Sequence, residues 1–99
     1  MSTSSESTTT TATPPSSHEA AVVLPANLHA RPAGRLARAA ATFTSAVQLA
    51  YGDRTVNPTG VLAVMALGAT LGSTVTVRAE GPDAEQAVTA LAQILATAE

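Results

Sequence analysis

The sequence predicts an α+β fold in which helices cover one face of a single β-sheet. Stretches whose apolar residues alternate with polar ones, as in half-buried strands, are interleaved with stretches whose apolar residues recur at helical spacing. The chain has 99 residues, of which 45% are hydrophobic, and a formal net charge of -2, which suits one small domain with one core. The predicted order of elements is β-α-β-β-α-β-α. The uncovered face of the sheet can remain in contact with water.

The N-terminal segment differs in composition from the rest of the chain. Residues 1–17 are almost entirely Ser, Thr and Pro, with too little apolar surface to offset the entropy of ordering them. We therefore predict a disordered tail over 1–17 and a globular domain over 18–99. A role for the tail as a phosphorylation or docking segment stays open as an alternative.

The first strand is predicted over 19–25, where the apolar run EAAVVLP ends at Pro25. The first helix is predicted over 31–43, because Pro32 suits a first helical turn and apolar side chains recur on one face. That face carries Leu36, Ala40 and Phe43. Gly34 lies inside this helix, where glycine costs up to about 1 kcal/mol relative to alanine, so its presence indicates that another group approaches closely.

A hairpin and a short helix are predicted next. Apolar and polar side chains alternate along SAVQLAY, and Gly52 with Asp53 supplies a two-residue turn before the partner strand RTVN, which Pro58 closes. A short apolar helix follows over 59–69, ended by Gly68. The apolar face of the first hairpin strand carries Val47, Leu49 and Tyr51.

The last strand is predicted over 73–80 and the last helix over 83–99. Asp83 and Gln86 form the pattern of a capping box, in which two side chains bond backbone N–H groups of the first helical turn. The inward face of the strand carries Val75, Val77 and Ala79. The apolar stripe of the helix consists of Ala84, Ala87, Val88, Leu91 and Leu95.

Composition excludes several classes of function. The chain has no cysteine, so disulfides and thiolate metal sites are excluded. The basic residues are five arginines in a mildly acidic chain, which does not suit general nucleic-acid binding. No metal-ligand cluster or nucleotide-binding glycine loop is present, so we expect neither a metal nor a cofactor. Apolar runs fall short of the roughly 20 residues of a membrane span, and no secretory signal is evident, so we expect a cytoplasmic protein.

His29 stands between the first strand and the first helix, at a helix start. Unbonded backbone N–H groups and the helix dipole favour negative charge there, so we expect the ring to react as the neutral imidazole, which is a nucleophile. A phosphoryl group on the ring would lie beside those N–H groups and the guanidinium of Arg31. Spacing alone leaves a solvated histidine as an alternative. Arg31, Arg35 and Arg38 are spaced to form one stripe along the helix.

The stretch LHARPAGRLARAA over 28–40, followed by VLAVMALGA over 61–69, closely resembles the HPr family, the histidine phosphocarriers of the bacterial phosphoenolpyruvate-dependent sugar phosphotransferase system. The resemblance spans 19–98. It implies an open-faced β-sandwich with a four-stranded antiparallel sheet and three helices on one side. It also implies a monomer that carries phosphate rather than an independent enzyme.

Residue by residue, the resemblance implies that His29 is phosphorylated on Nδ1 by enzyme I, which draws on phosphoenolpyruvate. The phosphoryl group then passes to a sugar-specific enzyme IIA. Arg31 matches the active-site arginine of the family and Pro32 its helix-starting proline. The residues that the resemblance places against these partners are Ala30, Gly34, Val61, Leu62 and Met65. We add Arg35 and Arg38 of the arginine stripe to this partner surface.

Two positions depart from the family. Many members begin the second helix with a serine that a kinase phosphorylates, and Gly60 stands at that position here, so we do not expect this regulation. The residue before Leu28 is commonly glycine and is Asn27 here. Because Asn tolerates positive φ better than other non-glycine residues, we expect the loop to keep its shape.

Two other functions stay open. The same chemistry could serve a nitrogen-related or dihydroxyacetone-kinase relay. Alternatively, the domain could be a non-catalytic regulatory module that binds through Val61, Leu62 and Met65. The presence of His29, Arg31 and Pro32 together weighs against a module that only docks, since docking has no use for a nucleophilic ring.

Overall fold

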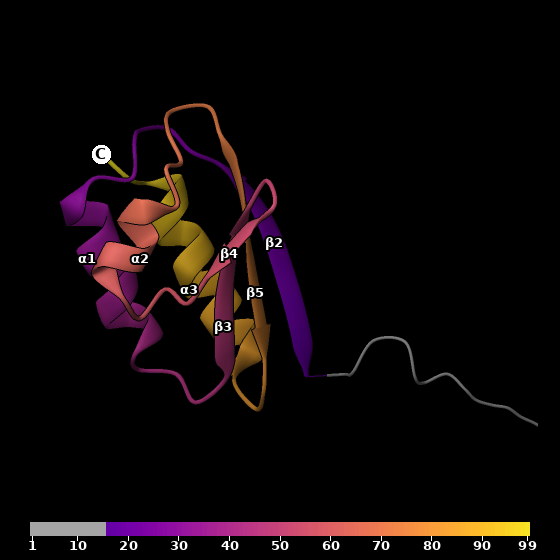
Figure 1. The fold of residues 1–99 in the computed structure, drawn as a ribbon. Helices are drawn as coiled ribbons and strands as arrows, with labels where there is room; N and C mark the ends of the chain where they lie inside the picture. The colour runs from indigo at the N-terminus through magenta and orange to yellow at the C-terminus, as the bar shows by residue number, and fades with distance from the viewer. Residues whose placement is uncertain (1–15) are drawn as a thin grey trace, which may run out of the picture.

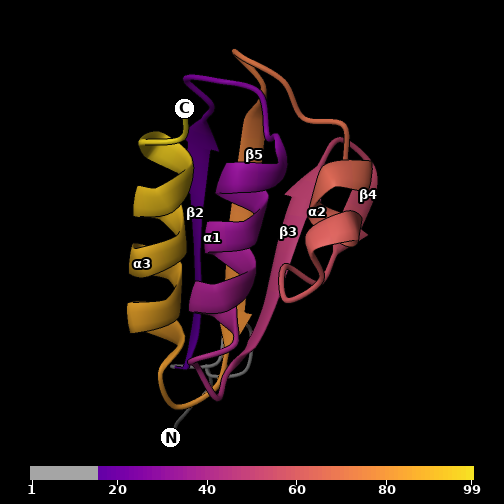
Figure 2. The same ribbon diagram turned by 90° about the vertical axis from the view of Figure 1, so that its left-hand side faces the viewer.

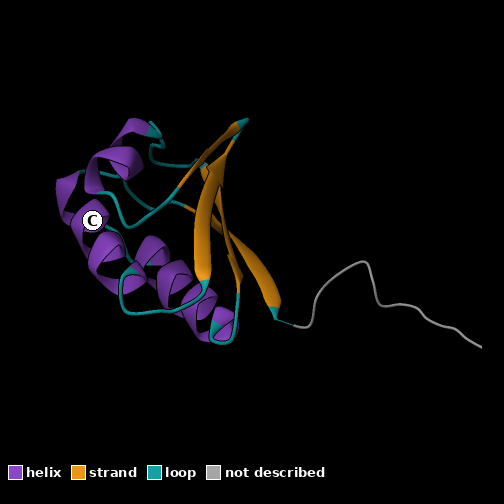
Figure 3. Cartoon of the chain, turned by 60° about the horizontal axis from the view of Figure 1, so that its bottom comes forward, coloured by secondary structure: helices purple, strands orange, loops and turns teal. Residues whose placement is uncertain are grey.

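The computed structural model describes residues 16–99, which form an open-faced β-sandwich. Figures 1 and 3 show two layers, with the helices on one face of the sheet. In chain order the described elements are β2 (Ser17–Val23), α1 (Ala30–Ala40), β3 (Ala46–Tyr51), β4 (Arg54–Val56), α2 (Val61–Ala66), β5 (Thr74–Glu80) and α3 (Ala84–Ala96). The predicted fold class and order of elements are confirmed. None of the helices in this part of the chain is long and apolar enough to span a membrane.

The sheet is antiparallel and has the strand order β2-β5-β3-β4. The central strand β5 pairs with β2 on one side, where Val22 faces Val75, and with β3 on the other, where Leu49 faces Val77. Because side chains alternate across a sheet, one face of β5 and β3 is turned towards the helices. The buried residues on that face are Val47, Leu49, Val75, Val77 and Ala79, as the alternation predicted.

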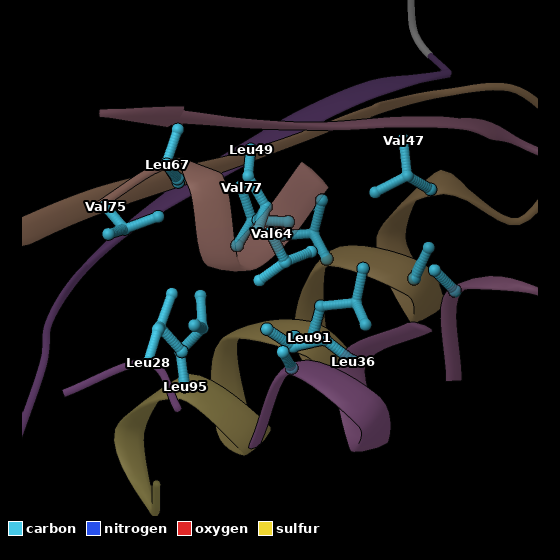
Figure 4. Close-up of a cluster of buried hydrophobic side chains, with 14 of the residues drawn as sticks. Leu28, Leu36, Val47, Leu49, Val64, Leu67, Val75, Val77, Leu91 and Leu95 are labelled. Atoms are coloured by element: carbon cyan, nitrogen blue, oxygen red, sulfur yellow. The ribbon is translucent and has the colours of Figure 1, made fainter. Parts of the chain in front are cut away.

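The core is aliphatic and lies between the sheet and the three helices. The apolar stripe predicted for α3 is buried along its whole length. Figure 4 shows Leu36 of α1 next to Leu91 of α3, with Leu49 and Val77 of the sheet above them. Full burial of one such side chain contributes about 1.5–3 kcal/mol, so packing alone can hold this cysteine-free domain together.

The first helix is shorter than the spacing predicted. It ends at Ala40 rather than at Phe43, because the next N–H groups bond three residues back and tighten the chain into a turn. The N–H groups of Thr42 and Phe43 bond the carbonyls of Ala39 and Ala40 at 3.1 and 3.3 Å. Phe43 is still partly buried against the core. Its spacing therefore predicted its burial correctly, although the helix does not extend that far.

The other boundaries differ less. The strand β2 begins at Ser17, one residue inside the predicted tail, because Ser17 pairs with Glu80. Residues 1–15 lie outside the described residues, so the tail over 1–17 stays a prediction. The helix α2 occupies only part of the predicted 59–69, and Gly68 ends it as predicted, with φ of 77°.

The predicted capping box at α3 is wrong. Asp83 occupies the N-cap position, yet its side chain does not cap the helix. Its carboxylate accepts hydrogen bonds from the N–H of Thr44 at 3.0 Å, from the N–H of Ser45 at 2.9 Å and from the Ser45 hydroxyl. The Asp83 N–H in turn donates to Ser45 Oγ at 3.1 Å. These hydrogen bonds connect the start of α3 to the α1–β3 connection. Because the two segments are distant in sequence, a local pattern could not predict this contact.

Acid should weaken this contact. The hydrogen bond from the Ser45 hydroxyl, followed by that from the Thr44 N–H, holds the pKa of Asp83 below its ordinary value of 3.8. A lowered pKa means that the contribution to stability is present above pH 3.8 and is lost as the pH falls through the folded-state pKa. Urea unfolding should therefore show Asp83→Asn less stable than the wild type at neutral pH, with the difference shrinking in acid. A constant difference down to pH 2 would contradict this, and Asp53→Asn, which removes the same charge from the hairpin turn, is the matched control.

Candidate functional site

His29 is the last residue before α1 and occupies its N-cap position with an extended backbone, φ -80° and ψ -175°. Its carbonyl oxygen accepts the first helical hydrogen bond, from the N–H of Ala33 at 3.0 Å. Its side chain is exposed, does not cap the helix, and makes no hydrogen bond to any other described residue. The imidazole is thus presented to solvent, and neither ring nitrogen is hydrogen-bonded to another described residue.

The first turn of α1 adds hydrogen-bond donors beside the ring. The N–H groups of Ala30 and Arg31 precede the first helical bond and have no helix carbonyl to accept them. Pro32 is buried at the third helical position, where its missing N–H costs nothing. The guanidinium of Arg31 is exposed in the same turn. An anion next to the ring would meet two amide donors, the positive end of the helix dipole and one arginine.

The loop that carries His29 is held from behind by the α2–β5 connection. At its base, the Leu24 N–H bonds the Ser73 carbonyl at 2.8 Å and the Leu24 carbonyl accepts from the Gly72 N–H at 2.9 Å. Nearer the histidine, the Leu28 N–H bonds the Ala69 carbonyl at 3.2 Å. The Leu28 side chain is buried, and Figure 4 shows it beside Leu95. The backbone leading into His29 is therefore fixed by the core and by a second loop.

The three arginines of α1 are all exposed, as the predicted stripe requires. Within residues 16–99 the ion pair that forms joins Arg78 and Glu19 at 3.3 Å, on the sheet. Arg31, Arg35 and Arg38 therefore have no carboxylate partner among the described residues, and their charge is available to an anionic ligand or an acidic surface.

Gly34 lies on the same helix, where we predicted close approach by another group. A Cβ built at this position would lie 3.6 Å from Arg38 Nη1, which is ordinary contact with a flexible side chain. No other described element comes within that range. Packing within the described residues does not require glycine here, and the close approach predicted for Gly34 is not made by any of them.

The helix α2 places two large apolar side chains in solvent. Leu62 is 80% exposed and Met65 40% exposed, whereas Val61 is partly buried against the core and offers less surface. Figure 2 shows α1 and α2 side by side in the helix layer. The two helices that carry the residues predicted to contact partners therefore lie next to each other in one layer, and Ala30, the first residue of α1, is exposed as well.

Gly60 is the N-cap residue of α2, with φ -101° and ψ 116°, a backbone conformation open to any residue. A Cβ there would make ordinary contacts, 3.5 Å from Ala63 Cβ and 3.9 Å from the Asn57 carbonyl oxygen. A serine would fit at this position without strain. The glycine removes the hydroxyl and is not demanded by the fold.

Two features of this region were missed by the sequence prediction. Leu71 is 66% exposed in the α2–β5 connection, and its N–H donates to Asn27 Oδ1 at 2.8 Å. A leucine between Thr70 and Gly72, both typical of loops, was the signal for an exposed apolar residue. The contact between Leu71 and Asn27 could not be predicted from local sequence, since the two residues are distant in sequence.

In the described part of the chain no three His, Asp or Glu side chains gather to hold a metal ion.

An open-faced β-sandwich with an exposed histidine at the start of its first helix is the arrangement that the resemblance to the histidine phosphocarriers implied. The family model described as the PTS HPr component phosphorylation site matches residues 16–97. The chain therefore belongs to the HPr family of phosphocarrier proteins of the phosphotransferase system.

Individual relatives agree with this assignment. The phosphocarrier protein HPr of Cupriavidus necator is 39% identical over 69 residues, which cover 70% of this chain and 78% of the relative. The crystal structure of HPr from Bacillus anthracis has a TM-score of 0.74 at 32% identity, covering 80% of this chain and 96% of the other. Crh, the catabolite repression HPr of Bacillus subtilis, has a TM-score of 0.69 at 31% identity, covering 84% of this chain and 99% of that one.

Proposed function

We propose that His29 accepts a phosphoryl group from phosphorylated enzyme I and passes it to an enzyme IIA domain that serves sugar uptake. The observation that carries the proposal is the exposed, unbonded imidazole at the N-cap of α1, next to two free N–H groups and Arg31. Membership in the HPr family supports the same role.

The chemistry is one displacement in each direction. Nδ1 of the neutral ring, with the proton on Nε2, attacks phosphorus, and the bond between phosphorus and the donor atom of enzyme I breaks, leaving its electron pair on that atom. The new phosphoryl group is a dianion, which the N–H groups of Ala30 and Arg31 and the Arg31 guanidinium stabilise. Transfer to enzyme IIA reverses the same step, so the carrier returns to its starting state.

Docking of both partners would use the exposed surface of α1 and α2. Leu62 and Met65 supply an apolar centre, and Arg35 and Arg38 supply positive charge beside it. Gly34 directly precedes Arg35 on the same helix, and no other described element lies within 4 Å of a Cβ built there, so a partner backbone could come close. Because Gly60 has no hydroxyl, we propose that this carrier lacks a phosphorylation switch at that position.

The experiment is to incubate the full chain with phosphoenolpyruvate and a catalytic amount of enzyme I. We expect one phosphate per chain, stable in base and labile in acid as a P–N bond is, and mapped to His29 by mass spectrometry. Adding an enzyme IIA domain should then move the phosphate to it. No phosphate on the wild-type chain would refute the proposed function. Transfer of the phosphate to the acceptor of another relay, and not to enzyme IIA, would refute only the proposed role in sugar uptake.

Reversal of charge on α1 should slow partner association. Arg35→Glu together with Arg38→Glu should reduce the association rate with an acidic partner by about tenfold at low ionic strength and weaken its dependence on salt. Stopped-flow transfer at several salt concentrations measures both effects. Arg78→Glu reverses a charge on the open sheet face and is the control, so equal slowing by this variant would show that net charge and not the α1 stripe controls association.

A further inference from the structure

One side chain fastens the His29 loop to the rest of the molecule. Asn27 Oδ1 accepts a hydrogen bond of 2.8 Å from the N–H of Leu71, 44 residues further along the chain. The backbone carbonyl of the same asparagine accepts from the His29 N–H at 2.9 Å. Asn27 therefore contacts the second loop with its side chain and the reacting residue with its main chain.

The hydrogen bonds that hold the His29 loop are made by its neighbours and not by the His29 ring. Its ring makes no hydrogen bond to a described residue, so its position depends on the backbone of the residues around it. The nearest backbone bond to the second loop, from the Leu28 N–H to the Ala69 carbonyl, is longer at 3.2 Å. Loss of the Asn27 side-chain bond would leave the segment before His29 attached mainly through Leu28.

The α2–β5 connection, whose Leu71 N–H donates this bond, is held by further hydrogen bonds. The Thr70 N–H bonds Ser73 Oγ at 3.1 Å, and the Ser73 N–H bonds the Thr70 carbonyl at 2.9 Å. Ser73 Oγ also lies 3.3 Å from the hydroxyl of Tyr51 at the end of β3. Leu71 sits within this closed turn, so its N–H is a fixed point for Asn27. Figure 2 shows this connection and the start of α1 at the same end of the molecule.

We infer that Asn27 is a positioning residue for phosphoryl transfer, acting through the backbone that presents His29. The inference rests on the proposed function of His29. In-line attack on phosphorus requires the ring nitrogen to be held within a narrow range of positions, and a mobile loop spends less time in that range. Partner docking would use α1 and α2, and the Asn27 side chain is hydrogen-bonded to Leu71, which lies in neither helix, so its loss should lower kcat and leave KM unchanged.

The test compares variants in transfer from phosphorylated enzyme I. With Asn27→Ala, kcat should fall roughly three- to tenfold, as expected for one exposed hydrogen bond that fixes the geometry, while His29 is still phosphorylated to completion. Amide hydrogen exchange at Leu71, measured by NMR, should accelerate by a similar factor. Asn27→Asp keeps an oxygen acceptor at the same place, so it should restore protection of the Leu71 N–H.

Asn57→Ala is the matched control, because Asn57 Oδ1 also accepts a backbone N–H, that of Thr59 at 3.0 Å, at the opposite end of α2. We expect this variant to keep the wild-type kcat. The positioning role is overturned if Asn27→Ala has the same kcat as Asn57→Ala, or if KM rises while kcat stays constant. Failure of the wild type to accept phosphate would be a different result, since it would remove the proposed function and with it this inference.

Discussion

His29→Ala is expected to abolish phosphorylation of the chain by enzyme I while leaving the fold intact. The substitution removes the proposed nucleophile, and no neighbouring group in the described structure can replace an exposed ring nitrogen at the start of α1. The side chain is exposed and forms no cap hydrogen bond, so the helix does not depend on it. Acid-labile phosphate should fall to background, and the thermal midpoint should stay within a few degrees of the wild type.

His18→Ala is the matched control for this result. His18 is the other histidine of the chain and lies in β2, opposite Ala79 of β5. We expect this variant to be phosphorylated like the wild type. Phosphate that persists in His29→Ala and disappears in His18→Ala would contradict the assignment of the site. Phosphate that resists acid in both variants would point to Ser or Thr instead.

Local patterns in the sequence were sufficient to predict the elements and the core. Alternation along β5 and helical spacing along α3 each report which side of an element is buried, and burial is what the structure confirms. The same signal failed at Phe43, which is partly buried and yet lies beyond the end of α1. Apolar spacing thus predicts contact with the core better than it predicts where a helix ends.

Contacts between distant segments were beyond local reasoning. The carboxylate of Asp83 was predicted to cap its own helix, whereas it bonds Thr44 and Ser45 across the fold. The sequence predicted only the backbone conformation that Asn27 tolerates. The hydrogen bond from Leu71 to its side chain depends on the tertiary packing of two loops distant in sequence. For the candidate site, the position of His29 at a helix start was predictable, but the support behind it required the structure.

Gly81→Ala is expected to be the most destabilising of the substitutions considered. Gly81 has φ of 142°, which L side chains rarely adopt, and a Cβ there would lie 2.6 Å from Ser45 Oγ and 2.8 Å from Ser45 Cα. Ser45 is buried and held by Asp83, so it cannot move aside freely. Backbone strain and overpacking together should cost roughly 3 kcal/mol, which corresponds to a fall in Tm of about 15 °C for a domain of this size.

Thermal unfolding followed by circular dichroism measures this effect, and Gly52→Ala is the reference variant for a glycine with positive φ and no crowding. Gly52 also has positive φ, 61°, in the hairpin turn, but a Cβ there would meet nothing within 4 Å. That variant should lose only the cost of a left-handed residue, about 1 kcal/mol. Figure 2 shows the β5–α3 connection at the end of the molecule opposite the start of α1, so Gly81→Ala should still accept phosphate at a temperature where it is folded. Equal destabilisation by the two variants would mean that the crowding against Ser45 contributes nothing and that backbone strain alone sets the cost.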